Sequence, residues 1–170
     1  MSESLVELFK HNVWATDQLF AACEELNDAQ LNASMAGAFG SVRSTLMHIV
    51  GAQERLATAL AEAGPVAEIH DCDTFPGLAT LREAARTSGE ALTEHAARAS
   101  AGATVTTTWR GEAYTLPVWL LLAQALTHAT EHRTQISAIL TQQGIEPPGL
   151  DAWTYHEDRF NGDWSQLWAT

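Results

Sequence analysis

The chain has 170 residues, of which 46% are hydrophobic, and its formal net charge is -12 with a single lysine, Lys10. A chain of this length forms one domain, residues 1–170, with a sizeable core. Its acidic surface would repel nucleic acid, and no apolar run reaches the roughly 18 residues of a membrane span. With a polar start and only Cys23 and Cys72 as cysteines, the sequence predicts a cytoplasmic protein without a disulfide scaffold.

Apolar residues recur at helical spacing in four long stretches. The predicted helices cover residues 4–26, 41–63, 78–99 and 117–144. Ser41 suits the N-cap of the second helix, whereas Gly89 weakens the third. Residues 27–31 predict one short turn, the Gly-, Ala- and Ser-rich stretch 32–40 predicts a loop, and the polar stretch 66–77 predicts a crossover.

A β-branched and aromatic stretch precedes the last predicted helix. Residues 104–109 and 113–116 flank turn-forming residues 110–112, which favours a short hairpin or an extended crossover. Pro117 suits the first turn of the next helix, and Gly144 suits its end about 40 Å further along. The predicted fold class is therefore all-α: a four-helix bundle with a long crossover and a short β-hairpin before the last long helix.

Two histidines share one face of the last predicted helix. His128 and His132 are four residues apart, which places them ~6 Å apart along the helix axis and ~40° apart around it. Both imidazoles can therefore reach one metal ion. The pair alone is weak evidence for a metal site, because a histidine on a helix is more often hydrogen-bonded or exposed to solvent than bound to a metal.

His48 is a third candidate ligand. It lies in the middle of a predicted helix, within the apolar stretch 46–50, where an unpartnered ring would be costly. A hydrogen bond in the core would satisfy it, but two histidines from a neighbouring helix would complete a three-nitrogen site with open positions for water or substrate. Competing metal motifs fail, because no helix carries Glu-x-x-His and His156-Glu157 does not continue into HExxH.

Several blocks of this sequence resemble the DinB/YfiT-like family. The similarity runs from about Leu8 to Tyr155 and includes the family's two signature blocks. The matching stretches are 11–15, 40–43 followed by 46–49, 127–136 and 140–151.

That resemblance implies a four-helix bundle, commonly dimeric, which binds a divalent metal through one histidine on the second helix and two on the fourth. The matching positions here are His48, His128 and His132. Family members that resemble this chain include thiol-cofactor-dependent transferases and isomerases, so the motifs imply a metal site without identifying a reaction.

Two polar residues near the predicted site are candidates for binding a cofactor. Gln135 lies one turn after His132, where it would orient a metal-bound water or complete a polar network. Arg43, five residues before His48, would hold a carboxylate of a substrate or thiol cofactor. The competing interpretation of Arg43 is a structural salt bridge, for example with Asp151.

The remaining polar and aromatic candidates are expected to have structural roles. Glu131 and Arg133 point about 100° away from His132, which favours a surface ion pair over a role behind the ligand. Trp14 and Tyr155 are expected in the core, and Cys23 has no neighbouring base to activate it. The expected solvent-facing or capping residues are His11, His95, His156 and the His70-Asp71-Cys72-Asp73 segment.

The sequence therefore predicts a metal-dependent enzyme that activates a low-molecular-weight thiol, as in thiol S-transfer, or a water, as in hydrolysis. Zinc or nickel is the expected ion, and iron is a third candidate. The alternative is a non-catalytic protein that binds metal or a small ligand. Trp164 and Trp168, four residues apart in an aromatic tail, predict a homodimer because one helical face would carry both rings.

Overall fold

The structure is a computed structural model that describes residues 2–61, 74–109 and 111–159. It is mostly helical, as predicted. In chain order its elements are α1 (Ser2–Glu24), α2 (Asp28–Leu31), α3 (Val42–Leu60), α4 (Leu78–Arg98), β1 (Thr104–Trp109), β2 (Glu112–Pro117), α5 (Val118–Gln142) and α6 (Ala152–Arg159).

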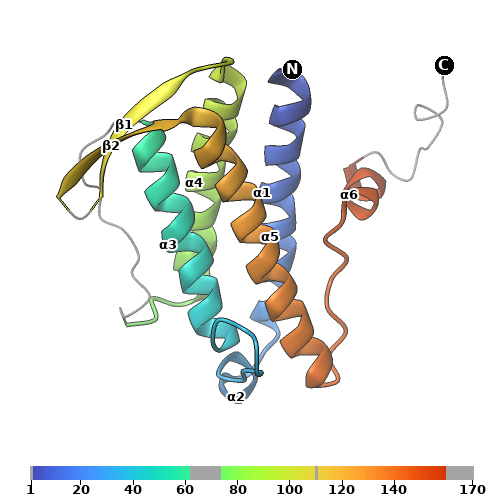
Figure 1. Ribbon diagram of the computed structural model, residues 1–170. Helices are drawn as coiled ribbons and strands as arrows, with labels where there is room; N and C mark the ends of the chain where they lie inside the picture. The colour runs from blue at the N-terminus through green and yellow to red at the C-terminus, as the bar shows by residue number, and fades with distance from the viewer. Residues whose placement is uncertain (1, 62–73, 110, 160–170) are drawn as a thin grey trace.

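The four long helices α1, α3, α4 and α5 form the predicted bundle (Figure 1). Helix α1 packs against α4 and α5, and α3 packs against the same two helices, so α1 and α3 lie diagonally across the bundle. Helices α3 and α4 run in the same direction, which is the arrangement that a long crossover between them produces. Among the helices in the described part of the chain, none combines the length and hydropathy of a membrane-spanning segment.

Capping side chains explain where two of the helices begin. Ser41 is the N-cap of α3, and its Oγ accepts a hydrogen bond from the Ser44 backbone N–H at 3.1 Å. Asn27 and Gln30 form a capping box that starts α2, the short turn predicted at residues 27–31. Each cap satisfies a backbone donor that the first helical turn leaves without a partner.

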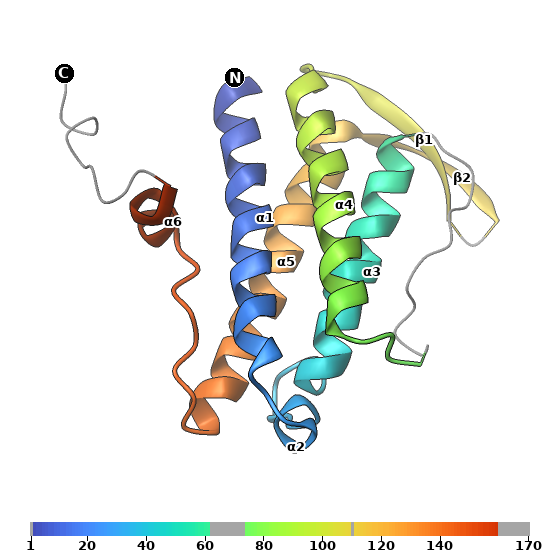
Figure 2. The same ribbon diagram turned by 180° about the vertical axis from the view of Figure 1, so that it is seen from behind.

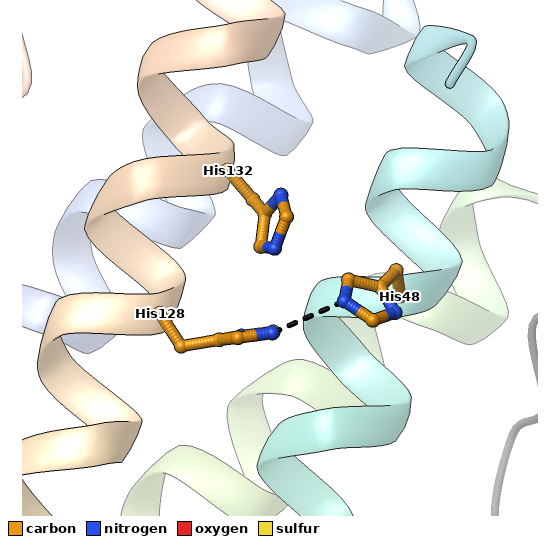
Figure 3. A group of neighbouring side chains, drawn as sticks. All are labelled: His48, His128 and His132. Carbon is orange, nitrogen blue, oxygen red and sulfur yellow. Dashed lines mark hydrogen bonds between the residues drawn. The ribbon is translucent and has the colours of Figure 1, made fainter. Parts of the chain in front are cut away.

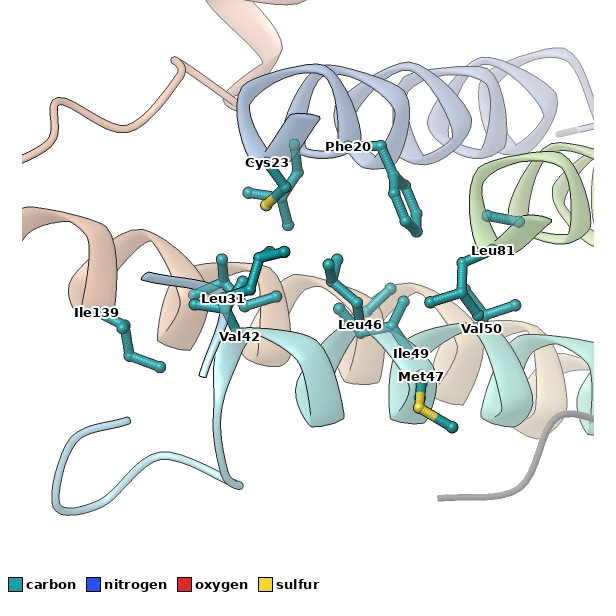
Figure 4. Close-up of a cluster of buried hydrophobic side chains, with 14 of the residues drawn as sticks. Phe20, Cys23, Leu31, Val42, Leu46, Met47, Ile49, Val50, Leu81 and Ile139 are labelled. Carbon is teal, nitrogen blue, oxygen red and sulfur yellow. The ribbon is translucent and has the colours of Figure 1, made fainter. Parts of the chain in front are cut away.

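Two clusters of buried apolar side chains fill the bundle. The first joins α1, α3, α4 and α5 near the α2 end and is drawn in Figure 4. The second lies toward the hairpin end and includes Phe9, Leu92 and Leu122, each with at most 2% of its surface exposed. Burial of such side chains contributes roughly 1.5–3 kcal/mol each to folding, so the core fixes the relative positions of α3 and α5.

Gly89 allows α4 to approach α1 closely and does not interrupt the helix. A Cβ at this position would lie 2.7 Å from Cγ2 of Val13 and 3.3 Å from Nε2 of Gln53. Helix α4 continues through Gly89 without a break, and the lack of a side chain there leaves room for Val13 of α1. The predicted weak point of the third helix is therefore a packing contact.

The hairpin forms as predicted at the end of the bundle where α4 ends and α5 begins (Figure 2). Strands β1 and β2 are antiparallel, with Val105 paired to Leu116. Val105 is buried in the second apolar cluster, and Leu116 packs against that cluster. Gly111 has φ +84° in the turn, a conformation that glycine adopts without steric cost. The hairpin therefore covers one end of the core.

Helix α6, which sequence patterning did not predict, packs along α1 (Figures 1 and 2). Asp151 directly precedes this helix, and its Oδ1 accepts hydrogen bonds from the backbone N–H groups of Trp153 and Thr154 in the first turn. Tyr155 is buried as predicted, and its hydroxyl donates to Glu7 at 2.7 Å. The predicted tail contacts of Trp164 and Trp168 lie outside the described residues.

Candidate metal centre

Three histidines from two neighbouring helices converge at the α3–α5 contact. His48 projects from α3, and His128 and His132 project from successive turns of α5 (Figure 3). The spacing of four residues places the last two rings on one face of α5, and that face contacts α3. The predicted triad is therefore brought together by the fold.

The distances within the triad suit a metal ion. One ring nitrogen from each histidine lies within 4.8 Å of the other two, and the ring centroids are 4.5–4.8 Å apart. Nε2 of His48 and Nε2 of His128 are 3.1 Å apart. Two nitrogens bound at 2.0–2.1 Å to a tetrahedral ion are separated by roughly 3.3 Å. In the structure the two nitrogens share a hydrogen bond (Figure 3), so both can bind one ion after a small shift and after the shared proton leaves Nε2.

The chemistry of the donors also fits a divalent metal. Neutral imidazole is a ligand that zinc, nickel, copper and iron accept. The described parts of the chain bring no carboxylate or cysteine sulfur into this cluster of ligand atoms. His132 is buried, whereas His48 and His128 are partly exposed, so the site lies at the edge of the core. These three residues could hold a metal ion with further coordination positions left for a small molecule.

Comparison with known proteins agrees with this fold. The sequence profile of the DinB family matches residues 1–163. The chain belongs to the DinB family. Its fold is similar to the crystal structure of a DinB-like protein from Bacillus cereus ATCC 10987, with a TM-score of 0.64 and 17% sequence identity over 86% of this chain and 95% of that chain. No curated protein matches the sequence.

In this DinB family protein, Gln135 lies directly behind the face of α5 that carries His128 and His132. Its Oε1 lies 2.9 Å from Nδ1 of His132 and also accepts the backbone N–H of Phe39 at 3.0 Å. The sequence-based alternatives for Gln135 were orientation of a bound water and completion of a polar network. The structure shows the contact to His132 itself, which is how metal-ligating histidines are commonly held.

Phe39 forms an aromatic wall of the site and was not predicted from the sequence. Its ring stacks on His48 with centroids 3.9 Å apart and an interplanar angle of 15°, and it meets His132 edge-on at 5.5 Å. The side chain remains 44% exposed. The only signal in the sequence is an aromatic residue within an otherwise small-residue loop, and that signal does not reveal which helix the ring contacts.

Arg43 lies in the first turn of α3, where it contacts Asp28 and Phe75. Its Nη2 donates to the Asp28 carboxylate at 2.8 Å, and its guanidinium carbon lies 4.6 Å from the centre of the Phe75 ring. Nε of Arg43 is buried and has no hydrogen-bond partner among the described residues. The salt-bridge partner is thus Asp28 rather than the predicted Asp151, and ligand binding by Arg43 stays a prediction.

Arg133 is buried, so the expected surface ion pair is wrong for this residue. Only 3% of Arg133 is exposed, and its guanidinium donates to Asn12 and Thr16 of α1 and to Thr130 of its own helix. Burial lowers the pKa of Arg133 to about 10, which leaves it cationic at neutral pH. The side chain of Arg133 points about 100° away from that of His132 around the helix. It still faces protein, because α5 packs against α1 as well as α3.

The other chemistry-bearing residues do not join the triad. Cys23 is fully buried, and burial raises the pKa of its thiol to about 12, which excludes a thiolate nucleophile there at neutral pH. His11 contacts the Leu150 carbonyl oxygen through Nε2 at 2.9 Å. Burial lowers the pKa of His95 below its usual range. The predicted His70-Asp71-Cys72-Asp73 segment lies outside the described residues.

Proposed function

We propose that this protein is a metal-dependent enzyme in which His48, His128 and His132 hold a zinc or nickel ion that activates a small thiol or a water. The donor set carries the proposal: three imidazoles and, within the described ranges, no carboxylate or thiol that would close the site. Catalytic zinc typically has three protein ligands, whereas structural zinc has four. Iron is a third candidate because imidazole also suits iron.

The bound ion would supply one chemical property, a lowered pKa of a coordinated thiol or water, and hence a nucleophile at neutral pH. The chain supplies the rest. His48 and His128 are partly exposed and leave access from solvent, while buried His132 is held in place by Gln135. A thiol nucleophile would lead to transfer onto an electrophile, and a water nucleophile would lead to hydrolysis.

Arg43 supports the thiol version of the proposal, because biological thiols commonly carry carboxylates. Its present partner Asp28 has 91% of its side chain exposed, and exposed ion pairs contribute only about 0–1 kcal/mol. A ligand carboxylate can therefore compete for this guanidinium, whose buried Nε has no partner among the described residues.

Cobalt substitution tests the proposal directly. The Co²⁺-loaded protein is titrated with carboxylate-bearing thiols and with simple alkyl thiols, and a sulfur-to-cobalt charge-transfer band is expected to appear as each binds. Arg43→Ala should weaken the binding of carboxylate-bearing thiols only. Arg86→Ala is the matched control, because Arg86 pairs on α4 with Glu83 and Glu90 and has no contact with the triad.

The outcome of the titration separates the candidate functions. If no thiol changes the cobalt spectrum at millimolar concentration, the thiol-transfer proposal is wrong and hydrolysis becomes the leading candidate. If the spectrum shows four protein ligands and responds to no added molecule, the protein is a metal-binding protein without catalysis, since a closed tetrahedron leaves no position for a reactant.

A further inference from the structure

A single oxygen atom connects the metal site to the loop that covers it. Gln135 Oε1 lies 2.9 Å from His132 Nδ1 and 3.0 Å from the backbone nitrogen of Phe39. The first contact is to a proposed metal ligand on α5, and the second is to the segment 33–40, which joins α2 to α3. Neither contact involves the triad nitrogens of His48 and His128.

This arrangement fixes the tautomer of His132. The backbone N–H of Phe39 can only donate, so the Gln135 atom that it meets must be the carbonyl oxygen, an acceptor. Since the same oxygen can only accept from His132, Nδ1 of that ring must carry the proton. Nε2 of His132 then presents its lone pair, as does a metal ligand whose other nitrogen is held by an outer partner.

The loop 33–40 is closed at its base independently of Gln135. Ser34 and Ser41 form an isolated antiparallel bridge, and the Val42 N–H donates to the Ala33 carbonyl at 3.1 Å. Toward the tip, the Phe39 N–H reaches across to α5 while the ring stacks on His48 of α3. The base therefore anchors the loop to α3, and Gln135 determines whether its tip is also held to α5.

We propose that Gln135 is a positioning residue that couples the metal ligand His132 to the Phe39 loop, so that metal binding and closure of the loop stabilise each other. The inference rests on the proposed metal site and adds a regulatory link to it. A histidine that holds a cation at Nε2 donates more strongly from Nδ1, which strengthens its bond to Gln135. The coupling is reciprocal, because any stabilisation of the closed loop by the metal must raise metal affinity by the same factor.

Amide hydrogen exchange of Phe39 tests the coupling on the full chain. We expect zinc to slow exchange of this amide about 10-fold, because closing the loop protects its N–H. Gln135→Leu removes the acceptor and should abolish the slowing, with zinc affinity falling by roughly 10- to 100-fold. Gln135→Glu keeps an acceptor oxygen at the same place and should preserve both effects.

Two further variants separate this role from general stability. Gln142→Leu makes the same substitution at an exposed position of α5 and should leave zinc affinity and Phe39 exchange unchanged. Phe39→Ala removes the stacked ring but keeps the backbone N–H, so zinc should still slow exchange of the amide at position 39. Retention of the effect in this variant would assign the link to the Gln135 oxygen instead of the aromatic contact.

The results distinguish this inference from the proposed function. Zinc that binds tightly without slowing Phe39 exchange, or a Gln135→Leu protein that binds zinc as tightly as the wild type, overturns the coupling and leaves the metal site intact. Failure of the wild type to bind zinc, nickel or cobalt overturns both. Slowed exchange that is lost in Gln135→Leu and kept in Gln135→Glu supports the coupling.

Discussion

Arg133 of α5 donates a hydrogen bond to Asn12 of α1 at 2.7 Å, in the interior of the bundle. Thr16 and Thr130 accept the other hydrogen bonds of the guanidinium, and no carboxylate contacts it within the part of the chain that the structure describes. A buried cation that is held by neutral oxygens depends on each of them, because an unsatisfied charged donor in the core is costly. Arg133, the residue after His132, thereby joins α5 to α1.

Asn12→Ala should destabilise the protein by about 1.5–3 kcal/mol, the range for loss of a hydrogen bond to a charged group. Urea denaturation of the metal-free protein measures the loss. Asn32→Ala is the matched control, because Asn32 is exposed at the end of α2 and should change stability by less than about 0.5 kcal/mol. Equal, small effects of both variants would show that Asn12 does not hold the guanidinium.

Gly89→Ala should destabilise the protein although alanine favours helices. The gain in helix propensity is about 1 kcal/mol, but the new methyl group would lie 2.7 Å from Cγ2 of Val13, and overpacking of this kind typically costs 1–3 kcal/mol. In a Val13→Ala background this obstacle is absent and only the 3.3 Å approach to Nε2 of Gln53 remains, so the same substitution should cost less than in the wild type. A double-mutant cycle by urea denaturation measures the difference, and additive effects would contradict the close approach.

Acid should weaken the attachment of α6 through Glu7 and Tyr155. The hydrogen bond from the Tyr155 hydroxyl, more than the charges of Lys10 and Arg159, holds the pKa of Glu7 below its usual value of 4.5. A carboxyl whose pKa is lower in the folded state stabilises the fold above the unfolded-state pKa. That stabilisation is lost as the pH falls through the folded-state pKa.

The free energy of unfolding should therefore rise with pH below about pH 4.5 more steeply in the wild type than in Tyr155→Phe, which lacks the donor to Glu7. Tyr114→Phe is the control, because it removes an exposed hydroxyl that bonds Glu112 in the hairpin, far in sequence from α6. Urea titrations at several acidic pH values compare the slopes. Identical slopes for wild type and Tyr155→Phe would show that this bond does not set the pKa of Glu7.

The parts of this structure that could be predicted from the sequence follow from helical periodicity. The stripes of apolar residues predicted α1, α3, α4 and α5 because each long helix buries one face. The spacing of His128 and His132 predicted their common face for the same geometric reason. The direction of His48 could be inferred from its apolar neighbours, since an isolated polar ring there requires a partner.

The missed parts depend on contacts between segments distant in sequence. Phe39 reaches the triad because the loop folds back onto α3 and α5, which no local pattern encodes. Arg133 looked like a surface residue because charge usually indicates exposure, yet its partners Asn12 and Thr16 come from α1. Helix α6 was not predicted, because its aromatic residues do not form a simple apolar stripe at helical spacing. Asp151 is the one signal for it, since an Asp before a helix is a common N-cap.

The aromatic tail should mediate formation of a homodimer. This proposal comes from the spacing of Trp164 and Trp168, whose rings would share one face of a helical turn and form an apolar patch. Light scattering should report twice the chain mass for the full protein and a monomer after deletion beyond Phe160. If the full chain is monomeric and the deletion lowers its melting temperature, the tail instead packs onto its own bundle.

Metal binding should raise the melting temperature only while the triad is complete. A ligand that binds the folded state alone adds about 2.7 kcal/mol when its free concentration is 100 times its dissociation constant, which corresponds to roughly 5–10 °C for a chain of this size. His48→Ala, His128→Ala and His132→Ala should each abolish the zinc-dependent shift, because each removes one of the three nitrogens that lie within 4.8 Å of one another. His95→Ala, which alters a histidine of α4 outside the triad, should keep it. Elemental analysis of the purified variants provides an independent readout, and a His48→Ala protein that retains both full metal content and the zinc-dependent shift would show that His48 is not a ligand.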